Sequence, residues 1–202
     1  MRAPARVIGL GVGPGTVAGG RESLVPLFRP LYDALLSRNA ASAFAQADET
    51  RWMVFIDRDG KAGHRWWLWV FLGADTVVFR LDPTRSHDVP EAHFPADARV
   101  VLMVDRYSAY KAMAQVKLGN IVLVFCWAHV RRDFVKVGKG WPEHKAWTLA
   151  WLGRNRALYL LDRRRRGLPA DHAEFPMAEA ALLPLVATMQ NQAASDLADP
   201  NV

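Results

Sequence analysis

The sequence predicts an α/β protein in which a mixed β-sheet is followed by a helical region. Three observations support this prediction. Residues 52–81 hold three apolar runs separated by turn residues, which is typical of an antiparallel meander. Residues 100–128 hold two more apolar runs around a helical segment, which is typical of a strand–helix–strand unit. From residue 129 onward, apolar residues recur at helical spacing.

The N-terminal part is expected to be helical rather than part of the sheet. The glycine-rich stretch GLGVGPGT at 9–16 lacks the spacing of a nucleotide-binding loop, so it predicts a flexible lead-in. Leucines at helical spacing predict an amphipathic helix, or a helix pair broken by proline, over 21–38, and the small residues that follow are expected to continue it. Turns of the meander are expected at Asp59-Gly60 and at Gly73-Ala74-Asp75. The expected strands, in chain order, are 52–56, 66–72, 76–81, 100–104 and about 120–128.

The charge of the chain is concentrated in one block. The net charge is +6, but residues 131–167 carry eleven Lys and Arg against three acids, and residues 168–202 carry five acids with no Lys or Arg. Such a block indicates a phosphate-bearing partner, and its run Arg163–Arg166 would contact phosphates without reading bases. A solvated helical face with a compensating acidic tail remains the alternative. The single cysteine, Cys126, excludes an internal disulfide, and no apolar run suits a membrane span or a signal peptide, so a cytoplasmic protein is expected.

Two aspartates lie at the ends of predicted strands. Asp48 stands just before the first strand of the meander, and Asp105 directly follows the apolar run 100–104. If those strands are neighbours, the two carboxylates can hold Mg²⁺, which prefers oxygen ligands and activates water for phosphoryl transfer. A turn or cap role for each acid stays open at this point.

Three motifs extend this hypothesis. ADETRW at 47–52, VDRYSAY at 104–110 and CWAHVRRDF at 126–134, in this order and spacing, resemble the DDE-type transposases of insertion sequences, in the group named for insertion sequence 66. The resemblance implies an RNase H-like fold: a mixed five-stranded sheet with flanking helices, followed by an all-helical insertion. It also implies that Mg²⁺ or Mn²⁺ supports the cleavage and joining of DNA ends, with Asp48 and Asp105 as the first two members of the catalytic triad.

The third acid of that triad is absent from the sequence. The family carries a glutamate in a segment of the form D-N-N-x-x-E-R, and no such segment occurs here, so a truncated copy is expected. Asp162 is the candidate substitute, but beside four arginines it is expected to form an ion pair. Glu49 follows Asp48, so in an extended segment its side chain points to the opposite face. The expected segments are a flexible lead-in (1–20), a helical segment (21–47), an RNase H-like catalytic core (48–140) and an incomplete helical insertion (141–202).

Basic residues outside the arginine run are candidate DNA contacts. Arg85 follows the third strand and matches an Arg-Ser pair of the family, and a turn residue stays open as the alternative. His129, Arg131 and Arg132 open a predicted helix, and arginines suit phosphates because their donors form a fork. A plain helix start explains these three residues equally well. Cys126 and His129 form only half of a zinc-site pattern, with no second pair to complete it.

These features together predict a transposase that catalyses Mg²⁺-dependent DNA strand cleavage and transfer, in a copy that is inactive alone because it lacks the third acid. The expected partners are DNA, as insertion-sequence ends and target, and further copies of the chain, with no membrane. The expected location is the bacterial cytoplasm, at the nucleoid. Two alternatives stay open: a non-catalytic DNA-binding remnant, and an RNase H-like nuclease that uses Asp48, Asp105 and Asp162.

Overall fold

The chain divides into a unit that contains a sheet and a helical unit. The computed structural model describes residues 5–7, 10–58 and 61–199. One unit, Met1–Phe125, contains the sheet, and the other, Cys126–Val202, is helical. An α/β unit followed by a helical region is the predicted fold class, which is confirmed.

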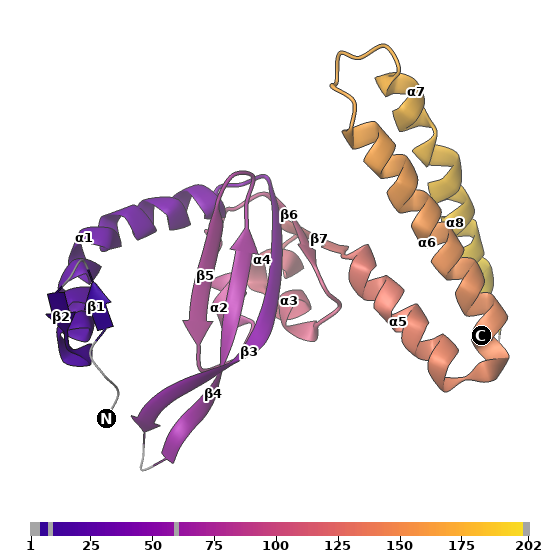
Figure 1. Ribbon diagram of the computed structural model, residues 1–202. Coiled ribbons are helices and arrows are strands. Elements are labelled where there is room, and N and C mark those ends of the chain that lie inside the picture. Colours follow the sequence, from indigo (N-terminus) through magenta and orange to yellow (C-terminus); the bar gives the residue numbers. More distant parts are fainter. Residues whose placement is uncertain (1–4, 8–9, 59–60, 200–202) are drawn as a thin grey trace. The chain divides into compact units, whose positions relative to one another are not determined.

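The first unit is built on a mixed five-stranded sheet with the strand order β5-β4-β3-β6-β7 (Figure 1). Strands β3, β4 and β5 form the predicted antiparallel meander, whereas β6 and β7 pair in parallel beside β3. This is the sheet that the resemblance implies. The turn expected at Gly73 is present, since its N–H donates to the Thr76 carbonyl at 2.8 Å, while the turn expected at Asp59-Gly60 lies outside the described residues. The strands are β3 (Phe44–Arg58), β4 (Lys61–Leu72), β5 (Val77–Asp82), β6 (Val100–Val104) and β7 (Ile121–Phe125).

Three short helices lie along one face of this sheet (Figure 1), and a long helix, α1, contacts β5. Helix α1 is continuous through Pro26 and Pro30, so the alternative of a proline-broken pair is wrong. Its Tyr32 hydroxyl donates to the Phe79 carbonyl of β5 at 3.4 Å. A short hairpin precedes it. The elements are β1 (Ala5–Val7), β2 (Leu10–Val12), α1 (Pro14–Ala40), α2 (Asp88–Glu91), α3 (Ser108–Ala112) and α4 (Ala114–Lys117).

Strand β3 begins at Phe44 rather than at the predicted Trp52, so the expected helical continuation after α1 is wrong. The segment pairs in parallel with β6, and Ala45 and Ala47 are buried against the core. Alanine has little intrinsic preference for strands, but tertiary pairing overrides propensity. As a result, Asp48 lies inside the strand instead of before it.

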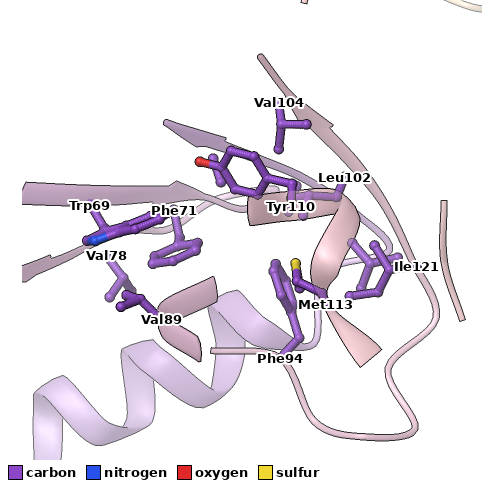
Figure 2. Packing of buried hydrophobic residues seen from close by; sticks show 13 residues of the cluster. Trp69, Phe71, Val78, Val89, Phe94, Leu102, Val104, Tyr110, Met113 and Ile121 are labelled. Carbon is purple, nitrogen blue, oxygen red and sulfur yellow. The ribbon is translucent and has the colours of Figure 1, made fainter. Parts of the chain in front are cut away.

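The core of the sheet unit is a cluster of large side chains between the sheet and the short helices (Figure 2). Trp69 and Phe71 of β4 stack in parallel, with ring centroids 6.5 Å apart, and Tyr110 of α3 packs edge-on against Trp69 at 6.1 Å. Leu102 of β6 and Met113, which separates α3 from α4, are fully buried in the same cluster. The core therefore fixes α3 against the sheet, and with it the loop that connects β6 to α3.

A buried polar pair joins the end of α1 to this core. The Asn39 side-chain amide donates to the carbonyls of Phe71 and Thr76, so its oxygen accepts from His93 Nε2 at 2.8 Å. His93 also stacks on Phe71, with ring centroids 3.8 Å apart. Burial, with a smaller effect of the Arg80 charge, lowers the pKa of His93 from 6.5 to about 4. His93 is therefore a neutral donor in the folded protein at neutral pH.

The second unit consists of helices, and two of its tryptophans donate hydrogen bonds to the same carboxylate. Phe134 of α5 stacks on Trp151 of α6 with ring centroids 5.2 Å apart. The indole N–H groups of Trp147 and Trp151 donate to Asp196 Oδ2 of α8 at 2.8 and 2.6 Å. No described helix is long and apolar enough to cross a membrane. The elements are α5 (Trp127–Gly140), the 3₁₀ helix η1 (Pro142–His144), α6 (Lys145–Arg166), α7 (Phe175–Ala180) and α8 (Leu182–Ala198).

Candidate functional site

The register between β3 and β6 aligns the two predicted aspartates. Phe44 pairs with Val101, and the next two pairs keep the same offset of 57 residues. Asp105 is also 57 residues after Asp48, two positions beyond the last of these pairs. Because side chains alternate along a strand, Asp48 projects on the face opposite the buried alanines of β3. Asp48 in β3 and Asp105, which directly follows the neighbouring strand β6, are therefore at the same level of the sheet.

Local hydrogen bonds orient both carboxylates. Asp105 Oδ1 accepts from the Tyr107 backbone N–H at 2.8 Å, which turns the chain from β6 into α3. Asp48 Oδ1 accepts from the Glu49 backbone N–H at 2.9 Å. Burial, and then the charges of Glu49, Asp105 and Asp48, raise the pKa of the Tyr110 hydroxyl well above its usual range. The charges of both aspartates therefore act in the same direction on this buried hydroxyl.

The donor set of this pair suits a hard divalent cation. Carboxylate oxygens are preferred ligands of Mg²⁺, which is commonly held by one or two carboxylates together with waters and substrate phosphates. No group of three or more His, Cys, Asp or Glu side chains capable of holding a metal ion occurs among the residues that the structure describes. The two aspartates thus fit a metal that a phosphate ligand would complete.

Glu49 lies on the opposite face and belongs to a different cluster. Its side chain is fully buried, as the alternation of the strand predicts for a neighbour of Asp48. It accepts hydrogen bonds from Arg85 Nε at 2.8 Å, from Arg85 Nη2 at 2.5 Å and from the Tyr110 hydroxyl at 2.6 Å. Burial raises the pKa of Glu49, and the hydrogen bonds from Tyr110 and Arg85 oppose this effect. Glu49 is therefore an anchor for Arg85, turned away from the aspartate pair.

Arg85 is held between two aromatic rings. Its guanidinium carbon lies 3.7 Å from the ring centroid of Tyr107 and 4.7 Å from that of Trp67. The Tyr107 hydroxyl donates to the Arg85 carbonyl at 2.9 Å, and the Tyr107 N–H donates to Asp105. About a third of the Arg85 side chain (35%) is exposed. The structure thus links this predicted DNA contact to Asp105 through a single residue.

The other predicted site residues lie in the helical unit. His129, Arg131 and Arg132 are on the first two turns of α5, so the predicted helix start is confirmed. The strand before it ends at Phe125, earlier than the predicted residue 128. Asp162 of α6 pairs with Arg165 at 2.9 Å and with Arg166 at 2.7 Å, as expected from the sequence. The hydrogen bond from Arg165 is the main cause of its lowered pKa.

Sequence reasoning missed the residues that hold Arg85. Trp67, Tyr107 and Tyr110 come from β4, from the loop after β6 and from α3. One signal was present, because an acid on the core face of a strand needs a buried partner. The partner itself lies 36 residues away and belongs to no local pattern.

Comparison with known proteins identifies the family. A sequence model described as "Transposase IS66 family" matches residues 2–199. The chain belongs to the IS66 transposase family. Two curated relatives, both from Sinorhizobium fredii, carry the names uncharacterized protein y4qI and uncharacterized protein y4jD. No solved structure matches this IS66-family chain.

The IS66-family chain corresponds to a part of each relative. It is 34% identical to y4qI over 118 residues, which is 52% of this chain and 22% of y4qI. It is 31% identical to y4jD over 158 residues, which is 71% of this chain and 30% of y4jD. The chain therefore spans less than a third of the length of either relative.

Proposed function

We propose that this IS66-family chain contributes an aspartate pair for Mg²⁺- or Mn²⁺-dependent cleavage and transfer of DNA strands during transposition. The observation that carries the proposal is the common offset of 57 residues, which aligns Asp48 with Asp105 across two parallel strands. Membership of a transposase family supplies the class of reaction. The substrate is DNA, as insertion-sequence ends and target.

In this proposal, Asp48 and Asp105 hold the metal, and Arg85 binds a phosphate elsewhere on the DNA strand. A bound metal would activate water and stabilise the charge that develops during phosphoryl transfer. The Asp105 side chain is oriented by the Tyr107 N–H, so its carboxylate does not have to reorder on binding. The two Arg85 nitrogens that donate to Glu49 fix the plane of the guanidinium, and its exposed edge keeps further N–H donors for a phosphate.

The proposal has two parts that are measured separately: metal binding and catalysis. Mn²⁺ bound to the purified chain in the presence of an insertion-end duplex is counted by electron paramagnetic resonance. Asp48→Asn and Asp105→Asn are each expected to reduce the bound Mn²⁺ by roughly tenfold, because a ligand charge is lost. Asp33→Asn is the matched control, since that acid is exposed on α1 and pairs with Arg29. Equal Mn²⁺ binding by all three variants would refute the metal site.

Catalysis is expected to be absent or very slow in this chain alone. Within the described ranges, no third carboxylate lies close enough to the pair to share a metal ion with it. The sequence also contains no D-N-N-x-x-E-R segment. Strand cleavage of an end-labelled insertion-end duplex is therefore measured with Mg²⁺ and with Mn²⁺. Efficient metal-dependent cleavage that Asp105→Asn abolishes would show that the two aspartates suffice for catalysis and that the predicted inactivity of this chain is wrong.

A second candidate function is DNA binding without catalysis, which the net charge of +8 over residues 131–167 favours. Binding to duplex DNA would then fall steeply with salt, because phosphate contacts release counterions. Filter binding across a salt series tests this candidate. An affinity that does not change with salt would exclude it.

A further inference from the structure

A groove in the helical unit combines basic, apolar and amide side chains. It occupies about 480 Å³ and is lined by residues of α5 and α6. Its lining contains three arginines, three leucines, one tyrosine and one asparagine, together with a glycine and without any acid. A volume of this size accepts a single small molecule or one nucleotide, and it is too small for a duplex.

The arginines of this groove differ from their neighbours in having no acidic partner. In the run at the end of α6, Arg164 pairs with Glu174 at 3.5 Å, and Arg165 and Arg166 both pair with Asp162. Arg163, the member of the run that lines the groove, has no ion pair with any residue that the structure describes. The same holds, over that part of the chain, for the other two groove arginines, Arg131 and Arg156. Three uncompensated guanidinium groups on one concave surface attract an anion.

The buried side chain of Asn155, which lines the groove, lacks hydrogen-bond partners among the residues that the structure describes. Its side chain is 1% exposed, and neither its amide nitrogen nor its carbonyl oxygen has a hydrogen-bond partner within the described chain. A buried carboxamide in this state is unfavourable, so a native example calls for an explanation. Because Asn155 lines the groove, a ligand that offers a donor and an acceptor side by side would satisfy both groups.

The remaining wall of the groove suits a flat ring. Tyr159 is 42% exposed, and Leu149 and Leu160 beside it are 58% and 54% exposed. An aromatic ring in a positively charged groove is the usual platform on which the bases of a single strand stack. Phosphate, a flat ring and a paired donor and acceptor are together the features of a nucleotide.

We propose that this groove binds an unpaired nucleotide of a DNA strand. The phosphates contact Arg131, Arg156 and Arg163, the base packs against Tyr159, and Asn155 bonds to the base edge. Adenine is preferred, because its N6 donor and N7 acceptor match the two groups of an asparagine carboxamide. The inference rests on the proposed function only for the choice of DNA as the strand.

The test is a binding measurement on the full chain with EDTA present, so that no metal-dependent step contributes. Fluorescence polarisation is measured with labelled single strands of oligo-dA and oligo-dT and with a hairpin duplex of the same charge. Tighter binding of oligo-dA than of oligo-dT or the duplex is expected. Tyr159→Leu is expected to weaken oligo-dA binding by about tenfold, which is within the range for the loss of one stacked base.

Two arginine variants of equal charge separate the groove from general basicity. Arg163→Gln is expected to weaken oligo-dA binding several-fold, because it removes an uncompensated contact. Arg164→Gln removes the same charge from the adjacent residue, which is paired with Glu174, and is expected to change the affinity by less than about twofold. Equal losses in the two variants would overturn the proposal, because charge alone would then explain the binding.

Asn155→Leu tests the contact with the base in a variant that is expected to fold normally. Replacing an unpartnered buried amide by an apolar side chain of similar size is expected to leave the melting temperature of the helical unit unchanged or higher. The same variant is expected to lose the preference for oligo-dA over oligo-dT. A preference that persists in Asn155→Leu would contradict the assignment. Cleavage assays with Asp105→Asn report on the proposed function alone, so the two hypotheses fail separately.

Discussion

The pair of Glu49 and Arg85 offers the sharpest prediction for the sheet unit. Removing one partner of a fully buried ion pair costs about 3–5 kcal/mol, but about a third of the Arg85 side chain is exposed, which reduces the penalty. For Glu49→Gln, which keeps the shape of the side chain and a partner for the Tyr110 hydroxyl, we expect a loss of about 2–3 kcal/mol in the free energy of unfolding.

A double-mutant cycle isolates the interaction itself. The variants are Glu49→Gln, Arg85→Met and the combination, and methionine keeps an unbranched chain between the rings of Trp67 and Tyr107. The expected coupling energy is about 1.5–3 kcal/mol, because two charge-assisted hydrogen bonds join the pair. Hydrogen exchange of β3 and α3 peptides measures the opening free energy of this unit without a contribution from the helical unit.

An exposed ion pair provides the reference for this cycle. Arg29 and Asp33 on α1 are 3.1 Å apart, with side chains that are 70% and 52% exposed. Their coupling energy in the same assay is expected to be below about 0.5 kcal/mol. A coupling energy for Glu49 and Arg85 that is no larger than this reference would refute the argument that burial makes Glu49 the anchor of Arg85.

Three further predictions concern stability. His93 binds a proton in the unfolded chain below about pH 6.5 and in the folded chain only near pH 4. The free energy of unfolding of the sheet unit is therefore expected to fall by up to about 3 kcal/mol as the pH decreases through this window. His93→Gln is expected to make this free energy, measured by hydrogen exchange, depend less on pH in the acid range. Asp196→Asn weakens two indole hydrogen bonds and is expected to destabilise the helical unit by about 1–2 kcal/mol in calorimetry; an unchanged transition would contradict this. In Gly73→Ala, the added Cβ would lie 2.5 Å from Ser42 Oγ, so a loss of about 1–3 kcal/mol is expected in urea unfolding. Ser42→Ala should restore part of that loss if the contact is its cause.

Most of the fold could be predicted from the sequence because its signal is local. An apolar run marks each strand of the five-stranded sheet, and most of these runs have a glycine or an aspartate at one end; the run at 120–128 continues past the end of β7. The start of β3 could not be found in this way, because Ala45 and Ala47 are small residues that fit a helix equally well. Ala45 pairs with Leu102 of β6 and Ala47 pairs with Phe71 of β4, so the strand state of both depends on residues far along the chain. Pairing across such a separation is tertiary information.

The residues of the candidate site also fall into those that a local pattern identifies and those that depend on tertiary contacts. The aspartates stand out in the sequence because each is close to an apolar run, and their alignment follows once the pairing of β3 with β6 is known. The anchor of Arg85 depends on side chains from three elements, which no local spacing relates to one another. Sequence reasoning could therefore name Asp48, Asp105 and Arg85, and it could not derive how the last of these is held.

For the basic block at residues 131–167, the number of charges overestimates the number of phosphate contacts. Residues 131–167 carry eleven Lys and Arg, and if each met one phosphate, the logarithm of the affinity for a single strand would fall with the logarithm of salt with a slope of about −8. In the structure, Arg164, Arg165 and Arg166 are already paired with acids. A groove that holds one nucleotide contacts only the two phosphates that flank it, which predicts a slope of only about −1.4 for oligo-dA. The slope therefore distinguishes a defined groove from a diffuse basic surface, because only a defined groove limits the number of phosphates that a strand can place on the protein.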